Sequence, residues 1–332
     1  MSLHALDDTD DAITVTIAFC RGLAVREWPK LALIALLSGG TAATSSLTGS
    51  FDIGGPGPTA GPTGGPGMGP MGMGAGGLPS VGFELFVAAI AGLVLLGLVL
   101  GALSATFQFV FVDALVTGDV AIRRPFAAHW RDGVRVFAFE LAVGLPALAV
   151  GVLAVAPLLV GLPAGPFFLL LLPVAGLLAL LASVVVGFTR AFVVPIVYHT
   201  DVGVLAAWRR LLGVVRANPG EYGAFVVVNF VLALIAGVIV GIGAFVAALV
   251  VTIPFGIVFG LPFALAGASG VLPWVWLAIG LLLGGLAFLL GVGLVTAPVQ
   301  AALRYYALLV LGDTEPDLAL VADRRAAARR DD

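Results

Sequence analysis

The chain has 332 residues, of which 61% are hydrophobic and 11% charged, with a mean hydropathy of +1.15 and a formal net charge of -3. A soluble domain of this length could not keep so apolar a surface in water, so the composition excludes a soluble globular protein and predicts a chain that lives in a bilayer. The single cysteine, Cys20, excludes an intramolecular disulfide, and the three histidines are too far apart in sequence to indicate a zinc site. We therefore expect neither a cofactor nor a metal.

The N-terminal segment, residues 1–30, is too charged to be a signal peptide, because acids precede the first base and no cleavage site follows an apolar core. Ile13, Ile17, Cys20 and Ala24 recur at helical spacing. This pattern predicts a cytoplasmic amphipathic helix that lies in the membrane interface.

The next two segments differ sharply in composition. Residues 31–47 form a first crossing that serine, threonine and glycine dilute and that is short for a bilayer. Residues 48–80 are a Gly/Pro/Met tract with one acid and no base, which cannot bury enough apolar area to offset the chain entropy. We expect a disordered external loop there.

Three long uncharged runs define the other crossings. They contain 28 residues after Glu84, 49 after Glu140 and 82 after Glu221. At about 20 residues for a membrane-spanning helix, the first holds one crossing and each of the others holds two. The predicted crossings are 85–112, 136–157, 167–189, 222–250 and 274–303. Between the last two, residues 253–273 are apolar but interrupted by glycine and proline, which predicts a re-entrant loop or, alternatively, an extra pair of short helices.

Residues 187–228 have the pattern of a segment that leaves the membrane, forms a cytoplasmic helix and re-enters. Asp201 is in place to cap this helix, and Asn218-Pro219 ends it. The predicted apolar stripe consists of Val204, Trp208, Leu211, Leu212 and Val215, and the opposite face carries Arg209, Arg210 and Arg216.

With six crossings and both termini in the cytoplasm, all sixteen lysines and arginines fall on the cytoplasmic side or at its boundary. Such segregation of basic residues sets membrane orientation. The expected fold is an all-α polytopic transmembrane bundle in the cytoplasmic membrane, with a transmembrane domain at 31–312 and a charged cytoplasmic tail at 313–332.

The crossings also resemble three copies of one unit: an amphipathic helix, a helix out and a helix back. The returning helices end in Gly118-Asp119-Val120, Thr200-Asp201-Val202 and Gly312-Asp313-Thr314. Internal repeats are common in membrane proteins, transporters among them. Chance similarity in so apolar a sequence is the alternative.

Three stretches carry a resemblance to a known family: FVFVDALVTGDVAIRRPF (109–126), RAFVVPIVYHTDVGVLAAWRR (190–210) and RANP (216–219). They resemble an uncharacterised family of prokaryotic polytopic membrane proteins of the haloarchaeal type, and the layout is similar to the membrane domain fused to some glycerophosphodiester phosphodiesterases. The resemblance implies a multi-helix membrane domain of unknown activity. No phosphodiesterase domain accompanies it here, so it implies no hydrolase activity.

Four charges lie just inside the apolar boundaries: Asp113, Glu140, Arg190 and Arg304. Because an isolated charge at membrane depth is costly, we predict that Arg190 pairs with Asp113 or Glu140 and that Arg304 joins them. The alternative is that each arginine extends to lipid phosphates. Trp130, Trp208, Arg209 and Arg210 are predicted anchors at the cytoplasmic interface.

No catalytic or nucleotide-binding motif is present, so we expect no enzymatic activity, and the basic residues are spread along membrane boundaries rather than gathered for nucleic acid. Membrane lipids are the expected partners, together with a membrane protein or a second copy of the chain. The favoured function is a non-enzymatic module that organises lipid or a partner protein. The alternative is a transporter or permease for a small or amphiphilic substrate.

Overall fold

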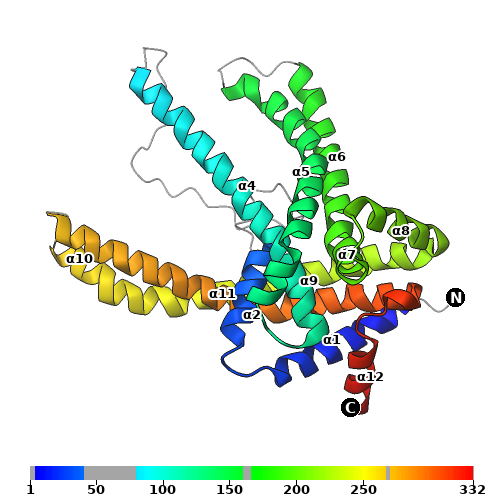
Figure 1. Cartoon of the computed structure of the whole chain (residues 1–332). Helices are drawn as coiled ribbons and strands as arrows, with labels where there is room; N and C mark the ends of the chain where they lie inside the picture. The colour runs from blue at the N-terminus through cyan, green and yellow to red at the C-terminus, as the bar shows by residue number, and fades with distance from the viewer. Residues whose placement is uncertain (1–3, 41–79, 160–165, 267–269, 332) are drawn as a thin grey trace.

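The computed structural model describes residues 4–40, 80–159, 166–266 and 270–331, and every regular element within these ranges is helical (Figure 1). The elements in chain order are α1 (His4–Gly22), α2 (Trp28–Ala35), η1 (Leu36–Gly40), α4 (Ser80–Thr117), α5 (Arg123–Leu159), α6 (Pro166–Phe188), η2 (Thr189–Val193), α7 (Val194–Thr200), α8 (Val204–Ala217), α9 (Pro219–Phe255), η3 (Gly256–Gly260), α10 (Leu261–Ala266), α11 (Val271–Thr314), η4 (Pro316–Leu318) and α12 (Ala322–Asp331). The elements η1, η2 and η3 are π-helical turns, and η4 is a short 3-10 helix. The prediction of an all-α polytopic helical bundle is confirmed.

Five helical stretches are long and apolar enough to cross a membrane. They are Val87–Thr117, Arg123–Ala156, Leu170–Thr200, Pro219–Leu265 and Val271–Thr314. They overlap the five crossings predicted beyond residue 80, since both rest on the length and apolar composition of the same stretches. These helices indicate a membrane protein.

The buried residues gather in one compact core at one end of these helices. The largest fully buried side chains include Phe109 and Phe111 of α4, Ile196 of α7, and Tyr305 and Tyr306 of α11. Residues of α1, α2 and α8 join the same cluster. The core therefore combines the inner ends of the long helices with the helices predicted to lie in the cytoplasm.

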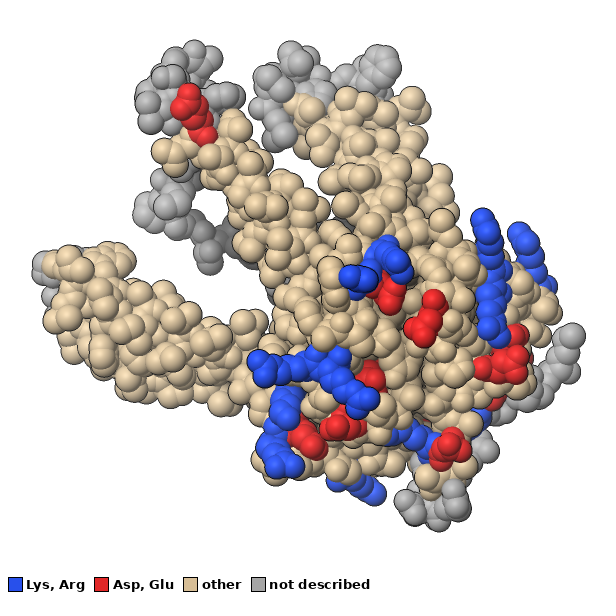
Figure 2. All heavy atoms as spheres, in the orientation of Figure 1, with Lys and Arg blue, Asp and Glu red and all other residues tan. Residues whose placement is uncertain are grey.

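Beyond the core, the long helices form three arms that leave it in different directions (Figure 1). We define the arms as residues 84–104 of α4, residues 141–187 of the α5–α6 hairpin and residues 226–295 of the α9–α11 hairpin. Most of their large apolar side chains are exposed. Figure 2 shows the described Lys and Arg side chains on the core, whereas the arms are uncharged apart from an acidic side chain at one tip. Glu84, in the second turn of α4, is that arm's acid.

The predicted first crossing is short in the structure. Together, α2 and η1 form an apolar helix of 12 residues, Trp28–Gly39, which packs against Gly293 of α11 through Ala32 and Leu36. Residues 41–47 and the predicted external loop up to Pro79 lie outside the described residues.

The described residues of the segment 253–273, for which we predicted a re-entrant loop, are helical except Gly270. The chain is helical to Ala266 and again from Val271, so the segment forms the end of the α9–α11 hairpin. Pro262 has no N–H to donate, and the π-turn before it, in which Leu261 N bonds Gly256 O, keeps the helix intact. The extra helix pair is also not present as an independent element.

In two helices the core buries a different face from the predicted apolar face, which in α1 was expected to lie in the membrane interface. In α1 the buried hydrophobic residues are Ala12, Val15 and Phe19, whereas Ile13 and Ile17 are about half exposed. In a sequence this apolar, both faces of a helix carry hydrophobic residues, and the neighbouring helix α11 decides which one is buried.

The same holds for α8, which buries Val204, Ala207, Leu211 and Val214 and leaves Leu212 exposed. Trp208 and Val215 pack at the edge of the core. Asp201 does not cap α8, whose N-cap is Gly203; it ends α7 in the left-handed conformation, with φ of 52°.

The predicted three-unit repeat has partial counterparts. Gly118 after α4 and Asp201 after α7 both have positive φ, so two returning helices end alike, whereas α11 continues through Gly312 to Thr314. The amphipathic stretch 123–137 is the first part of α5 and not a separate helix. The C-terminal segment is not a free tail, because Leu318 and Val321 are buried in the core.

Candidate functional site

An ion pair joins Arg190 and Glu140 where the arms leave the core. Arg190 Nε and Nη2 donate to the two carboxylate oxygens of Glu140, each at 2.9 Å. This bidentate geometry is the strong form of the arginine–carboxylate interaction. The side chains are 25% and 11% exposed, so the pair is largely shielded from solvent. Of the two partners that the sequence allowed for Arg190, Asp113 and Glu140, the structure shows Glu140.

Arg304 reaches the same place for a backbone reason. Pro195 has no N–H, and the π-turn η2 directs Val194 N to Thr189 O, which leaves the carbonyl of Arg190 without a backbone donor. Arg304 Nη1 donates to that carbonyl. We call Glu140, Arg190 and Arg304 the boundary cluster. It contains two positive charges and one negative charge.

The short helix α2–η1 ends beside this cluster. Gly39 has a φ of +101°, and a Cβ at this position would lie 3.5 Å from Arg190 Nη1 and 3.7 Å from Ser104 Oγ. Ser38 Oγ lies 3.3 Å from Gln300 Oε1 of α11. A helix C-terminus carries partial negative charge, so Arg190 Nη1 is well placed to stabilise it.

Asp113 lies apart from the boundary cluster, contrary to the prediction that places it there. It accepts a hydrogen bond from Tyr198 Oη at 2.8 Å. The Tyr198 ring packs against His129, which stacks on Phe109 with ring centres 5.6 Å apart. Tyr198 is a partner that sequence reasoning missed, because an aromatic residue near a helix end has no pattern that indicates its partner.

The predicted anchors have different surroundings. Trp208 Nε1 donates to Thr189 Oγ1 at 3.2 Å and its ring packs on Phe139, so this residue faces the protein. Trp130 is 48% exposed, with the Arg131 guanidinium 5.5 Å from its ring centre. Arg209 is exposed on α8.

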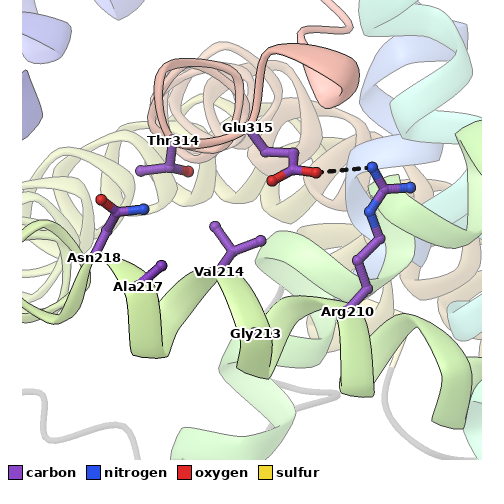
Figure 3. A pocket seen from close by; sticks show the side chains of 7 residues that line it. All are labelled: Arg210, Gly213, Val214, Ala217, Asn218, Thr314 and Glu315. Atoms are coloured by element: carbon purple, nitrogen blue, oxygen red, sulfur yellow. Dashed lines mark hydrogen bonds and ion pairs between the residues drawn. The ribbon is translucent and has the colours of Figure 1, made fainter.

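Arg210 borders a groove of about 330 Å³ between α8 and the end of α11 (Figure 3). Its Nη2 donates to Glu315 Oε1 at 3.0 Å, the pair that Figure 3 shows across the groove mouth. The groove is lined by Arg210, Gly213, Val214, Ala217, Asn218, Thr314 and Glu315. Because Glu315 balances Arg210, the groove offers no unmatched charge to a ligand.

A second charge cluster, which the sequence did not indicate, joins the two ends of the chain. Arg325 of α12 donates to Asp8 at 2.7 Å, Asp11 at 2.6 Å and Asp313 at 2.8 Å. Asp8 is 1% exposed, and its Oδ2 has no hydrogen-bond partner among the described residues. Burial, reinforced by the nearby Asp313 carboxylate, raises the pKa of Asp8 to about 7. The acidic and basic ends of the sequence looked like solvated tails, so only the fold shows that they meet.

Arg324 fastens α12 to the end of α4. Its Nε donates to Val116 O at 3.0 Å, and its guanidinium lies 5.9 Å from the Phe19 ring centre. Gly118, with φ of +77°, gives the guanidinium room. No group of three His, Cys, Asp or Glu side chains suited to a metal ion occurs among the described residues.

Comparison with known proteins gives one family. A model of a family of unknown function, DUF7544, matches residues 3–321, which is nearly the whole chain. No curated protein and no solved structure matches. The match agrees with the predicted resemblance to an uncharacterised family. It gives no evidence for a haloarchaeal source or for a relation to phosphodiesterase-fused domains. The chain belongs to the family of unknown function DUF7544.

Proposed function

We propose that the protein is a non-enzymatic membrane module that organises lipid around its three arms, with the core and both termini on the cytoplasmic side of the cell membrane. One observation carries this proposal: although neighbouring long helices pack in pairs, few residues of their most apolar stretches are buried inside the protein. In the most apolar stretch of each helix, the share of residues that are buried ranges from 0% in α4 to 22% in α11. Surface of this kind is stable only against lipid or another apolar partner.

The arrangement of charge supports the same reading. The arms are uncharged over lengths that match a bilayer, and the arginines begin where the arms meet the core. Basic residues at this level attract anionic head groups, with about 1 kcal/mol per residue near a charged leaflet. The likeness to a membrane domain that other chains fuse to glycerophosphodiester phosphodiesterases is consistent with a role beside lipid head groups.

Spin-labelled lipids test the proposal. In vesicles containing the purified protein, the splayed arms should immobilise more lipid per protein than a compact bundle with the same number of crossings. The immobilised fraction should favour anionic over zwitterionic lipid and lose this preference at high salt, because exposed charges are screened. An immobilised fraction no larger than that of the compact bundle would contradict the proposal.

The runner-up is a transporter or permease, and one observation favours it. Helix α2–η1 ends at Gly40 beside the boundary cluster, as a discontinuous helix ends at a transporter's binding site. Uptake of solute into protein-containing vesicles, lost on replacement of Glu140 or Arg190, would favour transport over the lipid-organising module.

A further inference from the structure

In the described part of the chain, Arg304 has no carboxylate partner, a condition it shares with Arg324, but unlike Arg324 it hydrogen-bonds to a second arginine, Arg190. Arg190, Arg210 and Arg325 each have a carboxylate within ion-pair distance, whereas no carboxylate lies within 4.0 Å of Arg304 among the described residues. The charged groups that act on Arg304 are Arg190 and Glu140. Since Arg190 takes both oxygens of Glu140, one positive charge of the boundary cluster is unmatched.

Arg304 also has hydrogen-bonding capacity to spare. A guanidinium carries five N–H donors, and one of them is used on the carbonyl of Arg190. Gln300 lies one turn before Arg304 on the same face of α11 and turns its Oε1 to Ser38. Its amide nitrogen carries two further donors on the same helix face, one turn from Arg304.

In the orientation proposed above, the site lies at the charged end of the long uncharged stretch of α11, where head groups are expected. Arg304 touches η2 within the core, past the end of the α9–α11 arm at residue 295, and its side chain is partly exposed. Leu294 and Leu290 are exposed about 15 to 21 Å further along α11, and Val184 and Leu181 are exposed on α6. A lipid with its phosphate at Arg304 would have apolar helix surface along its acyl chains.

We propose that Arg304 and Gln300 form a binding site for the phosphate of an anionic phospholipid. The inference rests on the proposed lipid-organising function and names the lipid class and the residues that select it. A planar guanidinium binds phosphate oxygens in a bidentate manner, and the amide of Gln300 donates to the same group. Anionic lipid is preferred because a zwitterionic head group brings its own cation, which offsets the charge that Arg304 leaves unmatched.

Native mass spectrometry of the full-length protein in detergent, titrated with phosphatidylglycerol, phosphatidylcholine or inorganic phosphate alone, tests the site. We expect one phosphatidylglycerol molecule to bind more tightly than phosphatidylcholine by about tenfold or more, in line with a charge-assisted pair. Equal binding of the two lipids would overturn the proposal. Saturation of the site by inorganic phosphate alone, with no gain from the lipid, would overturn its assignment to lipid.

Two variants at the site and one control make the test independent of folding. Arg304→Gln removes the charge but also leaves the carbonyl of Arg190 with a weaker donor. Gln300→Glu keeps the acceptor for Ser38 and places a carboxylate one turn from Arg304, so it should abolish the preference for phosphatidylglycerol in a folded protein. Arg26→Gln removes an exposed charge from the loop after α1 and should leave the preference unchanged.

A preference that survives in folded Gln300→Glu would overturn the site. The spin-label result is separate, because the arms immobilise lipid whether or not this one site is filled. Failure of the site and failure of the proposed function are therefore distinguishable.

Discussion

At the scale of single residues, the Arg190–Glu140 pair has a measurable role in stability. Replacing Arg190 with alanine leaves the Glu140 carboxylate, which is 11% exposed, without its partner. Breaking a buried ion pair from one side costs about 3–5 kcal/mol, and this pair is partly exposed, so we expect about 2–3 kcal/mol. The midpoint of thermal unfolding in detergent should fall accordingly.

A double replacement identifies the partner. Removing Glu140 as well as Arg190 takes away the stranded charge and should recover part of the loss. Removing Asp113 with Arg190 should recover nothing, because Asp113 bonds Tyr198 instead. Recovery with Asp113 and none with Glu140 would sink the pairing seen here.

Asp8 makes the core sensitive to pH. Its carboxyl pKa is raised from 3.8 to about 7 by burial and by Asp313, so folding favours the protonated form. Because the pKa is higher in the folded state, the contribution of Asp8 to the free energy of unfolding is most favourable below pH 3.8 and falls as the pH rises towards about 7. Asp8→Asn should therefore resemble the wild type near pH 4 and be more stable above pH 7.

Thermal unfolding measured across this pH range tests the effect of Asp8. The exposed Asp10, on the same helix, supplies the control: Asp10→Asn should follow the wild-type profile throughout. Parallel profiles for Asp8→Asn and wild type would show that Asp8 is charged in the fold at neutral pH.

At the scale of elements, α4 and α5 approach closely only near the core. A Cβ at Gly133 would lie 2.6 Å from Thr106 Cα, so the backbone would have to move. Further along α5, where the α5–α6 arm begins, nothing lies within 4 Å of a Cβ at Gly144. Gly133→Ala should destabilise by about 1–3 kcal/mol through overpacking. Gly144→Ala should be neutral or stabilise by up to about 1 kcal/mol, because alanine favours the helix.

Unfolding of the two alanine variants in the same detergent gives the comparison directly. The two replacements add the same methyl group to the same helix, so differences in detergent binding are small. Equal effects at Gly133 and Gly144 would mean that α4 and α5 do not pack as described.

Elements were more predictable than faces. Run length and charge are local properties, so the five long helices followed from the sequence. The buried faces of α1 and α8 did not, because Ile13 and Leu212 are as apolar as the residues that are buried, and only the position of α11 and α7 distinguishes them. The π-turns also escaped notice, although Pro195 and Pro262 each follow one by two residues.

At the scale of the whole molecule, contacts between distant residues limited what the sequence could reveal of the candidate site. The sequence placed Glu140, Arg190 and Arg304 at one depth, but helix rotation excludes Asp113 from the cluster. The Asp8–Arg325 contact joins residues 317 positions apart, which no local pattern encodes. The sequence thus brought three of the four charges together, and their partners came from packing.

The orientation of the whole molecule in the membrane is the remaining prediction. The core carries the described basic residues and Glu84 lies near the tip of its arm, so basic loop residues should hold the core in the cytoplasm and send the tip outside. In a Cys20→Ser background, Glu84→Cys or a cysteine in the 48–80 segment, such as Ala60→Cys, should react with a membrane-impermeant maleimide on intact cells. Leu205→Cys, at a position of α8 that is 64% exposed, should react only after the membrane is opened. Reaction of Glu84→Cys and Leu205→Cys from the same side would exclude a spanning α4, and reaction of Leu205→Cys alone from outside would invert the molecule.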